Sequence, residues 1–112
     1  MPPVRRTEDD ELCGHVEATD GQWRALTVFG SQLGVHDVRD DAEQQVRAEG
    51  LAVLADRWMA RNVDTGEEDV VRILEAHDGS VTIEFGYYPE PGARTLTLTR
   101  DDLASGPWIL ER

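Results

Sequence analysis

The spacing of apolar residues changes near residue 40, and this change restricts the fold more than any other feature. From Glu11 to Phe29 apolar and polar residues alternate around an Asp20-Gly21 step, which predicts two strands joined by a tight turn. A short third strand is expected after Gly34. From Asp40 to Arg61 the apolar residues recur about every four positions, which predicts an amphipathic helix. The stripe of this helix consists of Ala42, Val46, Gly50, Leu54 and Trp58.

The start of this helix carries a capping pattern. Asp40 can accept from the free N–H groups of the first turn, and Glu43, three residues later, can complete a capping box. Asp41 then lies where the helix dipole favours a negative charge. Gly50 costs about 1 kcal/mol relative to alanine inside a helix, so either the backbone is closely approached there or the helix breaks.

The last third of the chain has the pattern of an antiparallel sheet. The segments "DVVRILEA" and "SVTIEFGYY" flank a tight turn at His77-Asp78-Gly79, "RTLTLTR" adds a further strand, and one helical turn is expected after Arg100. The predicted fold is α+β, a mostly antiparallel sheet in the order βββ-α-βββ with one long helix packed on one face. Residues 1–10 are predicted to be a mobile arm and residues 11–112 a single domain.

Charge narrows the classes of partner. The formal net charge of the 112 residues is −12, which disfavours nucleic acid and anionic membrane surfaces and favours a basic protein partner. Every basic residue is arginine, so a lysine nucleophile or phosphate-loop lysine is excluded, and such usage is typical of a GC-rich bacterial genome. The single cysteine, Cys13, cannot form an internal disulfide, and no apolar segment resembles a signal or a membrane span, so we expect a cytoplasmic setting.

The histidines and the cysteine offer little catalytic chemistry. His36-Asp37 and His77-Asp78 are explained by a helix approach and a hairpin turn, and a metal site would require all three histidines to converge. Cys13 and His15 share one face of a strand, where an activated thiol is conceivable but core packing is the more common role. We therefore predict no cofactor, no metal and no catalytic residue, and we favour a role that is not enzymatic while the enzyme alternative stays open.

Acidic clusters and aromatic residues supply the candidate contacts. The expected contact set for a basic partner is Asp37, Asp40, Asp41 and Glu43, with Tyr88 as an exposed aromatic anchor. The competing hypothesis is a small-molecule pocket or accessory enzyme site between helix and sheet. That pocket would be lined by Cys13, His15, Trp23, Trp58 and Tyr87.

The segment from about Cys13 to Asp56 resembles the HicB-like antitoxin domain. The shared pattern is a strand, a "DG" turn, "QWRALTVFGSQLGVHDV" and the helix opening "RDDAEQQVRAEGLAVLAD". The resemblance implies an acidic partner that docks on a small basic RNA-cleaving toxin and blocks it. The chain departs from the family in lacking loop prolines and in ending with strands where such antitoxins often carry a DNA-binding element. The leading hypothesis is thus an acidic interaction domain, antitoxin-like or immunity-like, with the free sheet face as a candidate homodimer surface.

Overall fold

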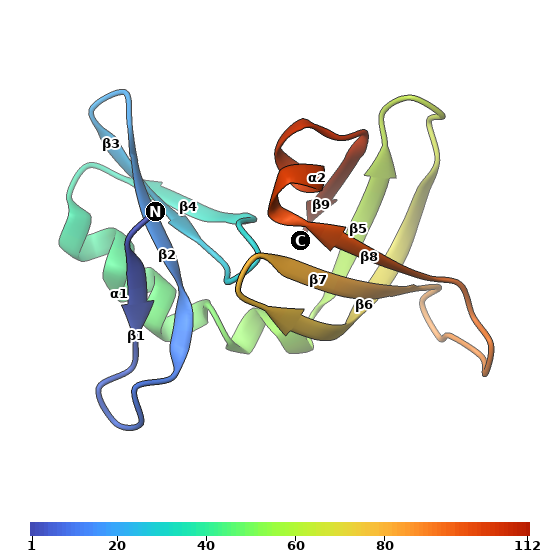
Figure 1. Ribbon diagram of the computed structural model, residues 1–112, viewed down its shortest axis with the longest axis horizontal. Coiled ribbons are helices and arrows are strands. Elements are labelled where there is room, and N and C mark those ends of the chain that lie inside the picture. The colour runs from blue at the N-terminus through green and yellow to red at the C-terminus, as the bar shows by residue number, and fades with distance from the viewer. The chain divides into compact units, whose positions relative to one another are not determined.

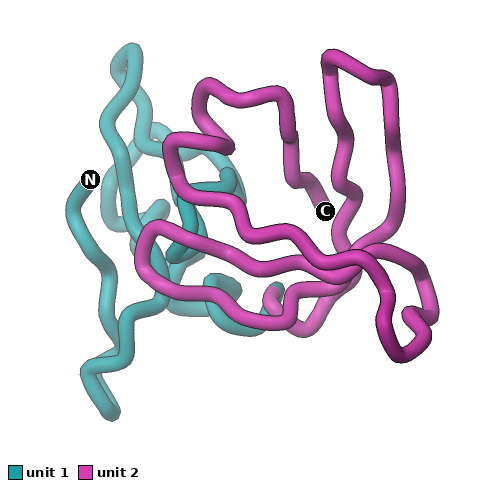
Figure 2. The backbone as a smooth tube through the Cα atoms, turned by 45° about the vertical axis from the view of Figure 1, so that its right-hand side comes forward, with its two compact units in different colours: residues 1–53 teal, residues 54–112 magenta.

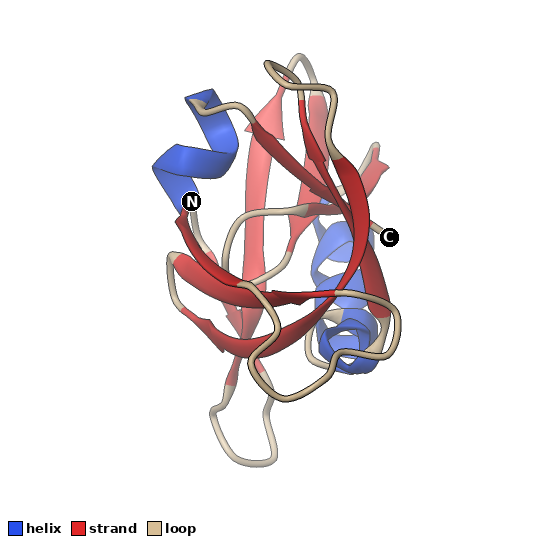
Figure 3. Cartoon of the chain, turned by 90° about the vertical axis from the view of Figure 1, so that its right-hand side faces the viewer, coloured by secondary structure: helices blue, strands red, loops and turns tan.

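The computed structural model describes all residues from 1 to 112, and they form nine strands and two α-helices. Backbone contacts group the chain into two compact units, residues 1–53 and 54–112 (Figure 2). Strands are the main regular structure of both units, and every strand pair is antiparallel (Figure 3). The predicted α+β class with antiparallel sheet is confirmed. The finer order βββ-α-βββ is not, because four strands precede the first helix and five follow it.

Unit 1 is a four-stranded sheet with one helix on it (Figure 1). Its elements are β1 (Pro3–Arg5), β2 (Leu12–Thr19), β3 (Gln22–Leu26), β4 (Gln32–His36) and α1 (Arg39–Glu49), and the strands lie in the order β1-β2-β3-β4. The predicted hairpin is confirmed: Asp20 and Gly21 both have positive φ, at 48° and 79°, as the tight turn requires. The buried cluster of this unit consists of Val4, Cys13, Val16, Ala25, Ala42 and Val46.

The N-terminal segment contains a strand where the sequence predicts a mobile arm. Pro3–Arg5 pairs with β2, and Val4, at 2% exposure, belongs to the buried cluster. The turn between β1 and β2 is held by an ion pair of 2.7 Å between Arg6 and Asp9. A single buried valine between Pro3 and Arg5 is too short a pattern for a strand to be recognised from sequence.

The long helix predicted for 40–61 is wrong, because α1 ends at Glu49. The N–H of Gly50 donates to the carbonyl of Val46, and a 3₁₀ turn at Ala52–Ala55 follows. Both alternatives for Gly50 hold: the helix stops there, and a Cβ at that position would collide with the carbonyl oxygen of Cys13. Trp58 therefore lies in a strand instead of a helix.

The predicted capping box at the start of α1 is also wrong. The N-cap residue is Val38, with no side-chain cap, so Asp40 and Asp41 both lie within the first helical turn. Glu43 does not accept from the backbone N–H of a capping residue. It is held by Arg39, one turn before it, at 2.9 Å, and by Arg47, one turn after it, at 3.7 Å.

Unit 2 is a five-stranded sheet with a short helix. Its elements are β5 (Arg57–Asn62), β6 (Glu68–His77), β7 (Ser80–Phe85), β8 (Thr95–Thr99), α2 (Arg100–Ser105) and β9 (Trp108–Glu111), and the strands lie in the order β8-β7-β6-β5-β9. The turn at Asp78-Gly79 and the helical turn after Arg100 are confirmed. A capping box does occur here, between Thr99 and Asp102. The buried residues of the sheet are Trp58, Ala60, Val71, Val81, Ile83, Phe85, Leu98, Trp108 and Leu110.

Candidate functional site

The strongest candidate surface lies in unit 1, where β4 leads into α1. Asp37, Asp40 and Asp41 are all exposed there, as are two apolar residues, Val35 at 43% and Val38 at 53%. We call these five residues the α1 entry face. Neither Asp40 nor Asp41 takes part in an ion pair, and Asp37 accepts one hydrogen bond, of 3.2 Å, from Gln22. The face thus combines uncompensated carboxylates with exposed hydrophobic side chains.

A glutamine bridge holds the entry face in place. The side-chain N–H of Gln45 in α1 donates to the carbonyl of Leu33 at 3.2 Å. Its Oε1 lies 2.7 Å from Nε2 of His36, and since an amide oxygen only accepts, His36 carries the proton on Nε2. Gly34 leaves room for this amide, because a Cβ there would lie 3.0 Å from Cδ of Gln45. The helix start and the strand end are therefore fastened together on both sides of Val35.

Arg39 is the one basic residue at the start of α1, and its charge is engaged. Its guanidinium donates to Glu43 at 2.9 Å and lies 5.2 Å from the ring centroid of Trp23. The side chain of Glu43 is only 21% exposed and also faces Arg47. Glu43, one of the predicted contact residues, is thus an internal partner of two arginines and offers less free charge than its aspartate neighbours.

Most of the other arginines are also paired with carboxylates, as Arg39 is. Nine of the eleven form an ion pair with a carboxylate: Arg6, Arg24, Arg39, Arg47, Arg61, Arg72, Arg94, Arg100 and Arg112. Because the chain carries 23 acidic residues, this pairing leaves many carboxylates without a cation. Exposed pairs contribute little to stability, and the unpaired carboxylates give the surface its negative charge.

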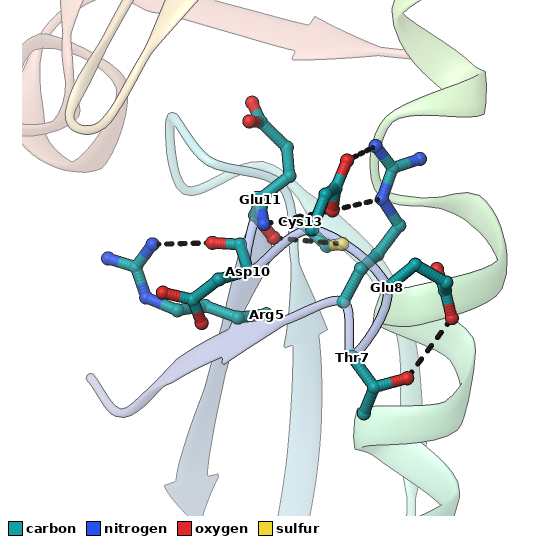
Figure 4. A network of polar contacts seen from close by, with 8 residues as sticks. Arg5, Thr7, Glu8, Asp10, Glu11 and Cys13 are labelled. Atoms are coloured by element: carbon teal, nitrogen blue, oxygen red, sulfur yellow. Dashed lines mark hydrogen bonds and ion pairs between the residues drawn. The ribbon is translucent and has the colours of Figure 1, made fainter.

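The acidic segment at residues 8–11 is folded into the turn that follows β1 (Figure 4). Arg5 donates to the carbonyl of Asp10 at 3.0 Å, and the bond from Arg6, together with the N–H of Glu11, lowers the pKa of Asp9 below its usual range. The carboxylates of Glu8 and Asp9 are bonded within the turn, whereas those of Asp10 and Glu11 are exposed and form no ion pair. The segment has no large exposed apolar side chain beside these acids, and in this it differs from the entry face.

Tyr88, the predicted aromatic anchor, is 80% exposed and lies in unit 2. Its ring and that of Tyr87 meet edge to face, with centroids 4.7 Å apart. Arg57 donates to the carbonyl of Tyr87 at 2.9 Å, and its guanidinium lies 4.3 Å from the Tyr87 ring centroid. The predicted contact set is therefore divided: four acids belong to unit 1 and Tyr88 to unit 2.

The residues of the alternative pocket are divided in the same way. Cys13, His15 and Trp23 belong to unit 1, whereas Trp58 and Tyr87 belong to unit 2. Cys13 is fully buried, and burial raises the pKa of its thiol, which reduces the fraction present as nucleophilic thiolate. Alternation along "SVTIEFGYY" predicts that Tyr87 lies on the buried face with Phe85. This prediction is wrong, because β7 ends at Phe85 and the Tyr87 side chain is 53% exposed.

Two features of the entry face are missing from the sequence prediction. Val35 and Val38 would be expected to face the core by their apolar character, and the exposure of Val38 follows from its place as the residue immediately before the helix. The Gln45 bridge has no sequence signal, because its partners lie on another element.

No group of three histidine, cysteine, aspartate or glutamate side chains has an arrangement that could hold a metal ion. Neither helix has the length and apolar character needed to cross a lipid bilayer. Comparisons with known proteins give no family model, no curated protein and no solved structure that matches the chain.

Proposed function

We propose that this protein is an acidic interaction domain that binds a basic protein partner through the α1 entry face, in a cytoplasmic setting. The observation that carries the proposal is the coincidence of exposed, unpaired Asp40 and Asp41 with exposed Val38 at one helix start. Carboxylates attract and orient a basic surface, and the valines supply apolar area that is lost to water on contact.

The helix dipole alone accounts for part of this charge. Asp40 and Asp41 stabilise α1 by lying at its positive end, whether or not a partner binds. It does not account for Asp37, which precedes the helix, or for Val35 and Val38, whose exposure costs free energy in water. The apolar residues are therefore what distinguishes the entry face from an ordinary acidic helix start.

An inhibitor of a basic enzyme is the form of this function that the HicB-like pattern suggests, and an immunity-like role has the same physical requirements. In either form a rigid acidic surface covers a basic substrate-binding surface on the partner. The bridge from Gln45 to His36 and Leu33 supports such a role, because a preformed surface loses little conformational entropy when it binds.

The test is affinity capture from a lysate of the source organism at low and high salt. The bait variant carries Asp37→Asn, Asp40→Asn and Asp41→Asn, which remove charge and keep the side-chain shape. The matched control carries Asp64→Asn, Glu68→Gln and Asp101→Asn, three exposed acids of unit 2 that take part in no ion pair. A basic protein held by the wild type and the control, but not by the entry-face variant, supports the proposal. Equal capture by all three overturns it.

A further inference from the structure

The two sheets end in four edge strands, β1, β4, β8 and β9. An edge strand presents backbone N–H and C=O groups with no ladder partner, and natural proteins protect such edges with short strands, prolines, charges or bulges. Three of the four edges have this protection. β1 is three residues long and starts at Pro3, β4 pairs irregularly with β3 and has its Leu33 carbonyl bonded by Gln45, and β9 has four residues and ends at the charged Glu111.

The fourth edge, β8, has no proline, no charge and no bulge, although the short helix α2 that follows it contacts it. Its five residues, Thr95–Thr99, read TLTLT and include no charge and no proline. Its pairing with β7 is unbroken from Glu84↔Thr95 to Ser80↔Thr99. Its three threonines are exposed on one face of the sheet, whereas Leu98 on the other face is buried.

The hydrogen-bonding direction of each β8 residue follows from the ladder. Phe85 donates its backbone N–H to the carbonyl of Arg94 at 2.9 Å, so Leu96 and Leu98, two and four residues on, also bond toward β7. The backbone groups of Thr95 and Thr97 consequently point away from the sheet. Neither residue has a backbone hydrogen bond on that side. The N–H of Thr99 is taken by the carboxylate of Asp102.

We propose that β8 is a self-association edge, where it pairs antiparallel with β8 of a second copy, centred on Leu96. In this register Thr95 faces Thr97 of the second copy and Thr97 faces its Thr95. The four outward groups of each strand then form four hydrogen bonds, and the bonded N–H of Thr99 is not needed. The outward N–H and C=O groups of Thr95 and Thr97 on one strand thus match those on an identical strand. For this reason a second copy of the chain is the partner that fits this edge best.

Charge sets the conditions for this pairing. Each copy carries a formal charge of −12, so two copies repel each other, yet β8 itself places no charged residue opposite another. Salt screens the general repulsion and leaves backbone hydrogen bonds largely unchanged, so the dimer is expected to strengthen as salt rises. Contact through the entry face has the opposite salt dependence. Because two strands bury little surface, the dimer is expected to form only at micromolar to millimolar protein concentrations.

Sedimentation equilibrium over that concentration range tests the proposal with two variants at one position. Thr97→Val and Thr97→Pro both remove the hydroxyl contact of 2.8 Å with Thr82, but only proline removes the outward N–H. Wild type and Thr97→Val should approach twice the mass of one chain at high salt, and Thr97→Pro should remain a single chain. Thr95→Pro serves as a second variant if circular dichroism shows that Thr97→Pro does not fold.

Amide hydrogen exchange locates the contact independently of substitution. The amides of Thr95 and Thr97 should become protected as the wild-type concentration rises, whereas they should exchange freely when the protein is dilute. A wild type that stays monomeric at millimolar concentration and high salt overturns the proposal. A dimer that persists in the folded proline variants, or that leaves both amides unprotected, overturns it equally.

Discussion

The carbonyl oxygen of Cys13 in β2 occupies the space that the Cβ of any residue other than glycine would need at position 50. Gly50 has φ −55° and ψ −38°, which every amino acid adopts easily, so this glycine is required by the contact and not by its backbone conformation. The close approach places the end of α1 directly against the sheet of unit 1.

The variant Gly50→Ala should therefore be less stable than the wild type. Helix propensity alone would favour alanine by about 1 kcal/mol. The collision with a backbone atom should outweigh this gain and lower the free energy of unfolding by about 1 to 3 kcal/mol. Urea denaturation followed by circular dichroism measures the change. A stabilised Gly50→Ala protein would show that the Cys13 carbonyl does not fill the space beside Gly50.

The Gln45 bridge should make a measurable contribution to the packing of α1 on β4. Gln45→Ala removes its bonds to His36 and to the Leu33 carbonyl, which should cost about 1 kcal/mol or somewhat more. Gln44→Ala is the matched control, because Gln44 is its exposed neighbour on the same helix. Equal unfolding free energies for the two variants in urea would show that the Gln45 bridge does not stabilise the packing of α1 on β4.

The acid limb of the stability curve should depend on Asp102. The hydrogen bond from the backbone N–H of Thr99, followed by the contact with its side chain, lowers the pKa of Asp102. A lowered pKa in the folded state stabilises the fold at neutral pH, and this stabilisation is lost as the pH falls through the folded-state pKa. Asp102→Asn should thus be less stable than wild type at neutral pH, and the difference should vanish in acid.

Asp101→Asn provides the control for this pH dependence, since Asp101 lies in the same helical turn and its carboxylate makes no capping bond. Thermal unfolding of both variants and the wild type over an acidic pH series measures the effect. A gap for Asp102→Asn that stays constant with pH, or is matched by Asp101→Asn, would contradict the proposed cap.

Cys13 should react as a buried structural thiol. Full burial and a raised pKa predict very slow reaction with a thiol reagent such as Ellman's reagent at neutral pH, and rapid reaction once the chain is unfolded in urea. Rapid reaction of the folded protein would instead support the alternative in which Cys13 and His15 form a reactive site.

The turns were predictable from sequence because their causes are local. The first turn needs only the positive φ of Asp20 and Gly21, the second only that of Gly79, together with the alternation on either side. The end of α1 at Glu49 was not predictable, because the glycine that follows it is required by a contact with Cys13, which is distant in sequence. Trp58 fits both the helical stripe and the alternation of β5, and only the pairing of β5 with β6 and β9 decides between them.

The candidate site was predictable in its charge and not in its apolar part. Asp37, Asp40 and Asp41 are exposed, as an acidic helix approach predicts. Hydrophobic patterning gives no reason to expect an exposed Val38, because a single valine between charged residues has no periodic neighbours. The occupation of Glu43 by Arg39 and Arg47 depends on where the helix begins, and helix starts are uncertain from sequence by a residue or more.

The central claim is that the acids and the valines of the α1 entry face bind the basic partner together. Isothermal titration of the captured partner tests it most directly, with the wild type, the triple Asn variant of Asp37, Asp40 and Asp41, and Val38→Ser, each over a series of salt concentrations. The triple variant should lose about tenfold or more in affinity and most of its salt dependence. Val38→Ser should bind more weakly while keeping the wild-type salt dependence. Wild-type affinity and wild-type salt dependence in both variants would contradict the claim.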